Sequence, residues 1–167
     1  MSAPLEIDIS LDCRQWADLS PTAEFLVRQA ITAAWQRCGS DEEAEISVFL
    51  TNAARIRTLN RRFRSQDKAT NVLSFLAQDS ATAGLPRMLG DVVLAFETIA
   101  REAHEQGKPI ADHIRHLCVH GVLHLLGYDH QSDADANVME LLEAEILATL
   151  GVSDPYAFET PELKSRA

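Results

Sequence analysis

The sequence predicts an α/β (α+β) fold in which helices flank a small mixed, mostly parallel sheet of about four strands. Three observations support this prediction. Four short segments have the alternation or the branched and aromatic composition of strands, helical patterns separate them, and no internal repeat or low-complexity linker interrupts the series. Strands and helices that alternate along a chain usually pack as layers around one sheet.

The four predicted strands differ in composition. Leu5–Leu11 alternates apolar and polar residues, as a half-buried or edge strand does, and Glu45–Leu50 is the second strand. Thr70–Leu76 is rich in branched and aromatic residues, and Gly90–Phe96 is the last strand. Because a helix links the second and third strands, we expect them to be parallel neighbours. Asp79–Arg87 is predicted to be a flexible loop near the substrate side, and it permits an antiparallel pair; the strand order stays open.

Helices are predicted from capping residues, breakers and apolar periodicity. Ser20 is the expected cap of the first helix, with Pro21 at its first position, and Asn52 is the expected cap of the second. Asp133 is the expected cap of the last, amphipathic helix. The predicted ranges are Ser20 to about Arg37, Asn52 to Phe63, a helix from Phe96 to the Gly107-Lys108-Pro109 break, Ile110 to Leu126, and Asp133 to about Leu150.

Composition predicts one globular domain over residues 1–167, with a disordered tail at 161–167. Apolar residues make up 46% of the chain, but no apolar run nears the roughly 20 residues that span a bilayer. The N-terminus lacks the features of a signal peptide. Cys13, Cys38 and Cys118 are scattered without C-x-x-C spacing, which is typical of a reducing compartment, and Cys118 is expected to pack in the core. We therefore expect a cytoplasmic protein with no membrane partner.

The strongest functional signal is a set of three histidines at spacing i, i+4 and i+10. Residues four apart share a helix face, so His120 and His124 can bind one ion side by side. Gly127 tolerates the left-handed conformation of a helix end, which lets the chain turn and bring His130 to the same ion. Three nitrogen ligands with an open fourth position are typical of catalytic zinc. The spacing predicts one Zn²⁺ per chain.

His116 offers an alternative pair, because it lies on the same helical stripe as His120. His116 and His124 are eight residues apart, which corresponds to about 12 Å along a helix. Zinc–nitrogen bonds of roughly 2.0–2.1 Å cannot span that distance, so only one pair can be used. His130 can join only the pair nearer the turn, which favours His120 and His124. The remaining histidines are expected to be ordinary core or surface residues: His104, His113 and His116.

The spacing also matches the zinc peptidase motif H-E-x-x-H-x-x-G-x-x-H of the metzincins, with one departure. Position 121 is glycine, where those proteases carry the glutamate that acts as general base. Gly121 cannot move a proton, which weakens the peptidase hypothesis unless another carboxylate reaches the site. Asp129 is the nearest candidate, but we expect it to end the helix or to orient a ligand.

Three segments together closely resemble the YbeY family, which comprises bacterial metal-dependent endoribonucleases of ribosomal RNA maturation. They are Leu59–Phe75, Gly90-Asp91-Val92 and the His-Gly-x-Leu-His-Leu-x-Gly-Tyr-Asp-His run from His120 to His130. The resemblance extends from about Glu45 to Tyr156. It implies a small mixed sheet with a zincin-like metal helix laid against it. It also implies zinc ligation by His120, His124 and His130, and a functional role for Arg64.

The charge distribution bears separately on RNA binding. A net charge of −10 argues against a polyanionic partner, since affinity for nucleic acid comes largely from Lys and Arg. Yet basic residues cluster before the third strand: Arg55, Arg57, Arg61, Arg62, Arg64 and Lys68. We expect about half of them to be plain surface. Arg64 follows the helix in a turn, where its planar fork can be aimed at a phosphate. Arg61 and Lys68 are the other expected substrate contacts.

Two further acidic features are expected to be structural. Carboxylates in the last helix suggest a cation site, but their helical spacing favours a solvated face: Asp133, Asp135, Glu140, Glu143 and Glu145. Asp91 is expected to start a strand rather than to act in catalysis.

The sequence thus predicts a zinc-dependent single-strand endoribonuclease. Arg64 and the zinc ligand His120 are the predicted catalytic residues, Arg64 neutralising charge on the phosphate. Either water or the RNA 2′-hydroxyl can be the nucleophile. The resemblance implies 16S rRNA 3′ end maturation, ribosome quality control, and the small ribosomal subunit with its assembly factors as partners. The alternatives are a metzincin-like zinc peptidase or hydrolase, and a ribosome-associated binding module with structural zinc.

Overall fold

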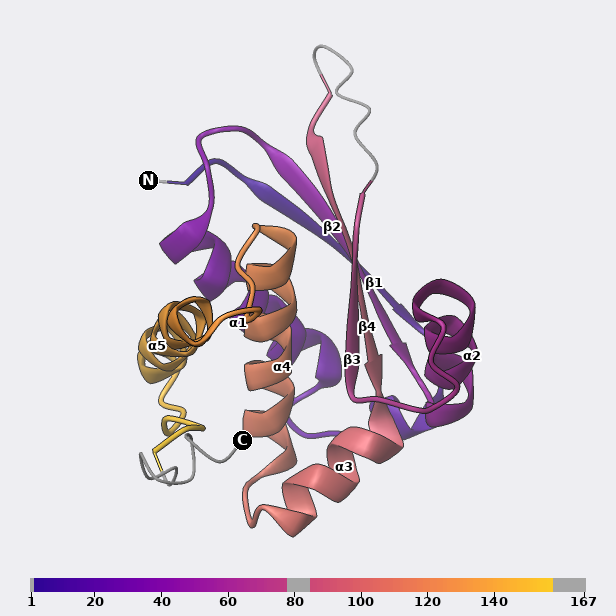
Figure 1. Ribbon diagram of the computed structural model, residues 1–167. Coiled ribbons are helices and arrows are strands. Elements are labelled where there is room, and N and C mark those ends of the chain that lie inside the picture. The colour runs from indigo at the N-terminus through magenta and orange to yellow at the C-terminus, as the bar shows by residue number, and fades with distance from the viewer. Residues whose placement is uncertain (1, 78–84, 158–167) are drawn as a thin grey trace.

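Figure 1 shows the computed structural model, which describes residues 2–77 and 85–157. In this part of the chain, no helix is both long and apolar enough to cross a membrane. The elements are, in order, β1 (Leu5–Leu11), the 3₁₀ helix η1 (Arg14–Asp18), α1 (Ala23–Cys38), β2 (Ala44–Thr51), α2 (Ala53–Arg64), β3 (Val72–Leu76), β4 (Arg87–Ala95), α3 (Phe96–Glu105), α4 (Ile110–Leu125) and α5 (Asp133–Thr149).

The four strands form one sheet in the order β1-β2-β4-β3. β1 pairs with β2 and β2 pairs with β4 in parallel, whereas β3 pairs antiparallel with β4. The predicted fold class, a small mixed and mostly parallel sheet flanked by helices, is therefore confirmed. Both neighbours of β2 are parallel strands, so only the β3 edge differs in direction.

The expected pairing of the second and third strands is wrong, because β4 lies between them. β4 has buried residues on both faces, as Val92, Val93 and Leu94 show, and such a strand belongs in the middle of a sheet. β3 is only half-buried and forms the edge. The alternative, an antiparallel pair across the predicted loop Asp79–Arg87, is what the structure shows. Most of that loop, like the predicted tail at 161–167, lies outside the described residues.

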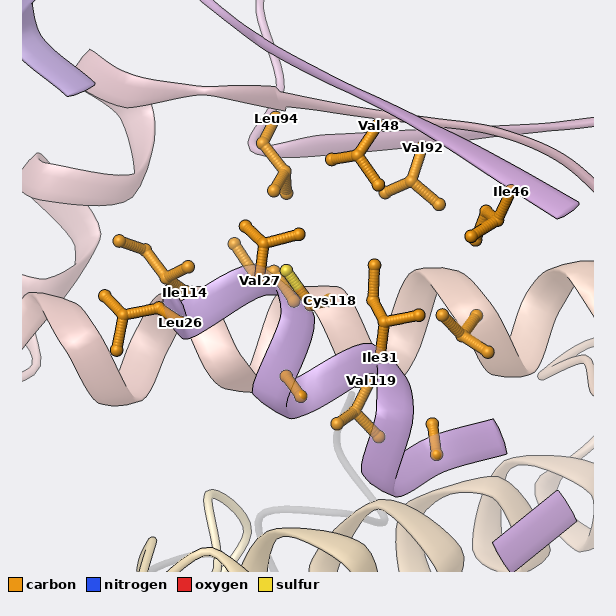
Figure 2. Packing of buried hydrophobic residues seen from close by; sticks show 14 of the residues in the cluster. Leu26, Val27, Ile31, Ile46, Val48, Val92, Leu94, Ile114, Cys118 and Val119 are labelled. Carbon is orange, nitrogen blue, oxygen red and sulfur yellow. The ribbon is translucent and has the colours of Figure 1, made fainter. Parts of the chain in front are cut away.

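The main core lies between one face of the sheet and the helices α1 and α4. Figure 2 shows side chains of the strands facing those of the two helices. Those labelled are Ile46, Val48, Val92 and Leu94 from the sheet, Leu26, Val27 and Ile31 from α1, and Ile114, Cys118 and Val119 from α4. Cys118 is fully buried, as predicted, and burial raises the pKa of its thiol to about 12. α4 is therefore held against the sheet along its length.

The other face of the sheet is covered only in part, by α2 (Figure 1). A small second cluster joins Ile56 of α2 to Val93 and Ala95 of β4. This sparse cover leaves part of the outer face open.

Two helix caps differ from prediction by one or two residues. The hydroxyl of Thr22, not of Ser20, accepts a hydrogen bond from the Phe25 amide at 3.2 Å. The hydroxyl of Ser132 accepts one from the Asp135 amide at 3.1 Å, so Asp133 is the first helical residue. In both places two capping residue types stand close together, and composition does not choose between them. The predicted Asn52 cap is confirmed: its side chain accepts from the Arg55 amide at 2.8 Å.

Candidate functional site

Three histidine side chains converge where α4 ends. His120 and His124 lie on α4, and the chain reverses after the helix at Gly127, whose φ is +102°. The reversal is held by a hydrogen bond from the Tyr128 amide to the Leu123 carbonyl, at 3.0 Å. It carries His130 back, so that one nitrogen from each of the three histidines lies within 4.8 Å of the others. The structure thus brings together the three predicted ligands.

The three residues fit a divalent metal ion. The Nε2 atoms of His120 and His124 are 3.0 Å apart, close enough for both to bind one ion at roughly 2.0–2.1 Å each. Burial lowers the pKa of His124, and the nearby rings of His120 and His130 lower it further. The neutral imidazole is the form that binds metal, so His124 is already in the correct state at neutral pH.

The other histidines do not belong to this group. His113 is buried and lies 2.9 Å from a carboxylate oxygen of Glu102 through its Nε2 atom. His116 lies one turn of α4 before His120, and His104 is exposed on α3. His113 is thus the core residue that was predicted, whereas His116 takes part in a network around the metal group.

The carboxylate of Glu143 is the centre of that network, and the prediction that it belongs to a solvated acidic face is wrong. Glu143 is 0% exposed and accepts a hydrogen bond from Nδ1 of His120. The face of α5 that carries Val138 and Leu141 is exposed instead. The bond to Nδ1 leaves Nε2 of His120 to face the metal position, as carboxylates behind metal-binding histidines do.

A tyrosine beyond α5 completes the network. The hydroxyl of Tyr156 donates to the second oxygen of Glu143 at 2.5 Å and lies 3.2 Å from Nε2 of His116. Burial would raise the pKa of Glu143, but the hydrogen bonds and charges of His116 and His120 outweigh it and lower the pKa to about 2. Glu143 is therefore an ionised acceptor behind His120. A carboxylate at ordinary helical spacing and a tyrosine in the following segment gave no sequence signal of this role.

Arg64 lies at the free edge of the sheet. It is the last residue of α2 rather than part of the following turn, and Ser65 ends the helix in the left-handed conformation, with φ of +56°. One guanidinium nitrogen of Arg64 donates to the Ser74 carbonyl of β3 at 2.5 Å. The guanidinium carbon lies 5.2 Å from the ring centre of Phe75. The arginine is thus held by the backbone and by a ring of the edge strand.

The same strand connects Arg64 to the metal helix. The hydroxyl of Ser74 donates to the Gly121 carbonyl at 3.3 Å, next to His120. Ser74 therefore touches Arg64 through its backbone and α4 through its side chain. Ser74 therefore connects Arg64 to the helix that carries His120 and His124.

Comparison with known proteins identifies the family. A family model described as Endoribonuclease YbeY matches residues 10–151. Endoribonuclease YbeY of Bradyrhizobium sp. (strain BTAi1 / ATCC BAA-1182) is 54% identical over 157 residues, which cover 91% of this chain and 91% of that protein. Endoribonuclease YbeY of Paramagnetospirillum magneticum (strain ATCC 700264 / AMB-1) is 48% identical over 161 residues, covering 93% and 98%. The chain belongs to the YbeY family.

A solved structure supports the fold of this YbeY chain. The solution structure of TM1509 from Thermotoga maritima matches with a TM-score of 0.54 at 23% identity, covering 93% of this chain and 97% of that one. The YbeY family match includes Arg64, the three histidines and Glu143, whereas Tyr156 lies beyond its end.

The packing of α4 explains why this YbeY chain has glycine where metzincin peptidases have glutamate. A Cβ atom on Gly121 would lie 2.9 Å from Cγ1 of Val92 and 3.2 Å from Oγ of Ser74. Position 121 therefore faces the sheet at close range and does not face the metal group. A glutamate there would have no room, so the peptidase base is excluded by the packing of the helix.

The remaining predicted site residues have different surroundings. Asp129 accepts a hydrogen bond from the backbone amide of His130 at 2.6 Å, which fits the expected role of orienting a ligand. Arg61 and Lys68 are exposed, and their side chains make no hydrogen bond or ion pair with the described residues. The structure does not bring either of them to the three histidines, although the Lys68 carbonyl is held by Asn60 at 2.9 Å.

Proposed function

We propose that this chain is a zinc-dependent endoribonuclease that cleaves single-stranded RNA at the His120, His124 and His130 centre, with Arg64 as the phosphate-binding residue. The observation that carries the proposal is the convergence of three imidazoles at the end of a helix that contacts Ser74, the residue to which Arg64 is anchored. A group of three protein ligands leaves a tetrahedral ion one position for solvent or substrate. Membership of a family described as endoribonucleases supports the reaction class.

The residues around the centre have distinct tasks. His120, His124 and His130 would hold the zinc ion, which would supply Lewis acidity toward a phosphoryl oxygen or a water molecule. His124 binds as the neutral imidazole, and His120 is kept in one tautomer and orientation by Glu143. Asp129 orients the backbone at His130. The donor set therefore stays aligned as substrate enters and leaves.

Arg64 recognises the scissile phosphate. Its guanidinium makes only one hydrogen bond among the described residues, to the Ser74 carbonyl, so its other N–H groups can serve a phosphate. The planar fork suits phosphate oxygens, and the stack on Phe75 limits the rotamers that must be ordered on binding. Charge that develops on the phosphate is then stabilised by a preorganised cation.

Glu143 is not free to act as a general base, because His120 engages one of its carboxylate oxygens and Tyr156 engages the other. Asp129 accepts from the amide of His130 through one oxygen and has no other hydrogen bond among the described residues. The nucleophile is either water or the RNA 2′-hydroxyl, and the cleaved ends distinguish them. A 2′,3′-cyclic phosphate requires attack by the 2′-hydroxyl, whereas a 5′-phosphate product excludes it.

The wider assignment follows the family resemblance. We expect the chain to act in the cytoplasm on the 3′ end of 16S rRNA and in ribosome quality control, together with the small ribosomal subunit and its assembly factors. Three imidazoles also accept nickel, cobalt or copper, so availability in the cell decides the metal.

His124→Ala tests the proposal. The purified variant should lose both the bound metal, measured by elemental analysis, and cleavage of a single-stranded RNA, with casein uncut by either protein. The matched control is His104→Ala, which alters an exposed histidine on α3. Retention of one metal per chain in His124→Ala would refute the ligand set. Cleavage of casein but not RNA by the native protein would favour the peptidase alternative. Bound metal with neither activity would favour structural zinc in a binding module.

A further inference from the structure

A groove runs between α2 and the outer face of the sheet, with a volume of about 490 Å³. Small-ligand sites usually measure roughly 300–1,000 Å³. Ser74 points its side chain toward α4, so its neighbour Phe75 points to the opposite face, into this groove. The groove and the histidine group therefore lie on the two sides of the edge strand β3.

Half of the apolar residues that line the groove are aromatic. Phe49 of β2, Phe63 of α2 and Phe75 of β3 contribute their rings. Phe63 is 58% exposed and meets Phe75 edge to face, with ring centres 5.5 Å apart. Aromatic rings that line a groove are platforms on which proteins stack the bases of single-stranded nucleic acids.

Two polar groups in the groove have no partner among the described residues. Thr51 is 1% exposed, and its hydroxyl oxygen makes no hydrogen bond. Asp91 is half-buried on β4, and burial raises the pKa of its carboxyl group without any donor to offset it. Thr51 is thus the buried unpaired group among the residues that line the groove, whereas Asp91 is open to water and can accept hydrogen bonds from a ligand there.

The groove is continuous with the Arg64 site. The ring of Phe75 lines the groove and also lies beneath the Arg64 guanidinium, while Arg55 lines the groove from α2. A strand of RNA that crosses β3 can therefore contact Arg64 on the way from the groove to the histidine group. A base and a phosphate of one substrate would then bind on different faces of β3.

We propose that this groove binds one base of the RNA substrate, with guanine preferred, by stacking on its phenylalanine rings and by hydrogen bonds to the carboxylate of Asp91. The inference rests on the proposed endoribonuclease function and adds a specificity site to it. Guanine carries two adjacent N–H donors on its Watson–Crick edge, and these match the two oxygens of a carboxylate. The other bases offer the carboxylate one such donor group or place acceptors beside it.

The chemistry of the lining favours a base over other occupants. A phosphate in the groove would meet the guanidinium of Arg55 but also two carboxylates, those of Asp12 and Asp91. Apolar side chains of a peptide would cover Asp91 and Thr51 without supplying hydrogen bonds from those side chains, and desolvated polar groups without partners are costly. A base supplies both an apolar face and N–H donors.

Binding of nucleotides to the full chain without metal tests the site separately from catalysis. We expect 5′-GMP to shift the ring NMR signals of Phe49 and Phe75 in a saturable manner, and AMP, CMP and UMP to bind at least about tenfold more weakly. Asp91→Asn should remove the preference for GMP. Asp8→Asn is the matched control, because Asp8 is an exposed carboxylate on the same face of the sheet outside the groove lining.

Phe63→Ala provides a second variant that does not depend on Asp91. Its ring is largely exposed, so the variant should fold and bind all four nucleotides about tenfold more weakly. The proposal is overturned by equal binding of the four nucleotides, by shifts confined to the histidine group, by unchanged binding in both variants, or by an apolar peptide that binds the groove where nucleotides do not. Absence of RNA cleavage by the metal-loaded protein would contradict the proposed function alone, since these measurements need no metal.

The position of cleavage provides an independent test of the proposed guanine preference. In a library of single-stranded RNAs, cuts by the metal-loaded protein should lie at a fixed distance from a guanine. This preference should disappear in Asp91→Asn while cutting itself persists. A cut pattern that is unchanged in Asp91→Asn would overturn the proposal.

Discussion

The Nδ1 atom of His120 is hydrogen-bonded to the carboxylate of Glu143, which lies 23 residues later in the chain. Two helices thus share the control of one imidazole: α4 places the ring and α5 fixes its tautomer. Tyr156 occupies the second carboxylate oxygen and keeps the carboxylate from turning away. The metal centre consequently depends on the packing of α5 against α4.

Glu143→Gln should weaken metal binding by about 10- to 100-fold, because the neutral amide is a poorer acceptor for Nδ1–H and no longer raises the basicity of His120. Competition with a chromophoric chelator measures the affinity, and the absorption spectrum of the cobalt-loaded protein reports the geometry. Glu145→Gln is the control, since Glu145 lies on the same helix and, within residues 2–77 and 85–157, makes only an exposed ion pair with Arg37, at 3.3 Å. Equal affinities in the two variants would contradict a role in positioning.

Arg64→Ala should lower the rate of RNA cleavage by about 100-fold or more, as loss of a preorganised donor at a developing charge does. Arg64→Lys should recover only part of the rate, because an ammonium group lacks the planar fork. Melting temperature should hardly change, since the side chain is exposed. Arg62→Ala, which removes the neighbouring guanidinium 5.3 Å from the Phe63 ring centre, is the control and should stay nearly as active as the native protein.

Gly121→Ala should destabilise the protein by about 1–3 kcal/mol, because the added methyl group has to displace Val92 or Ser74. Urea unfolding measures the change. Helix propensity alone predicts the opposite sign, since alanine is about 1 kcal/mol better than glycine inside a helix. A variant more stable than the native protein would therefore contradict the close packing of α4 on the sheet.

Stability should decline as the pH falls below about 6.5, in part through His113. Burial lowers the pKa of His113 from 6.5, although its hydrogen bond with Glu102 opposes the shift. The unfolded chain then takes up this proton at a higher pH than the folded chain, so unfolding is favoured as the pH falls through the unfolded value. Urea unfolding at pH 7.5 and 5.5 should show a smaller decline for His113→Gln than for the native protein. An identical decline would refute the assignment.

Local patterns accounted for most of the fold and for the metal group. The strands and helices, and the three histidines within a single turn and bend, depend on neighbours in the chain, which sequence spacing describes directly. The strand order does not depend on neighbours in the chain, because β4 lies in the centre of the sheet through long-range pairing with β2. Glu143 was missed for the same reason: its spacing on α5 is that of a surface carboxylate, and only tertiary packing turns it inward. The need for glycine at position 121 also depends on tertiary packing, because the sheet residues Val92 and Ser74 leave little space for a side chain there.

All three histidines of the candidate metal group fall between positions 120 and 130, whereas Glu143 and Arg64 come from distant parts of the chain. An unfolded chain therefore still holds the complete donor set within one short peptide and retains some affinity for the ion. Since binding to the denatured ensemble offsets binding to the native one, zinc should raise the melting temperature by less than its native dissociation constant implies.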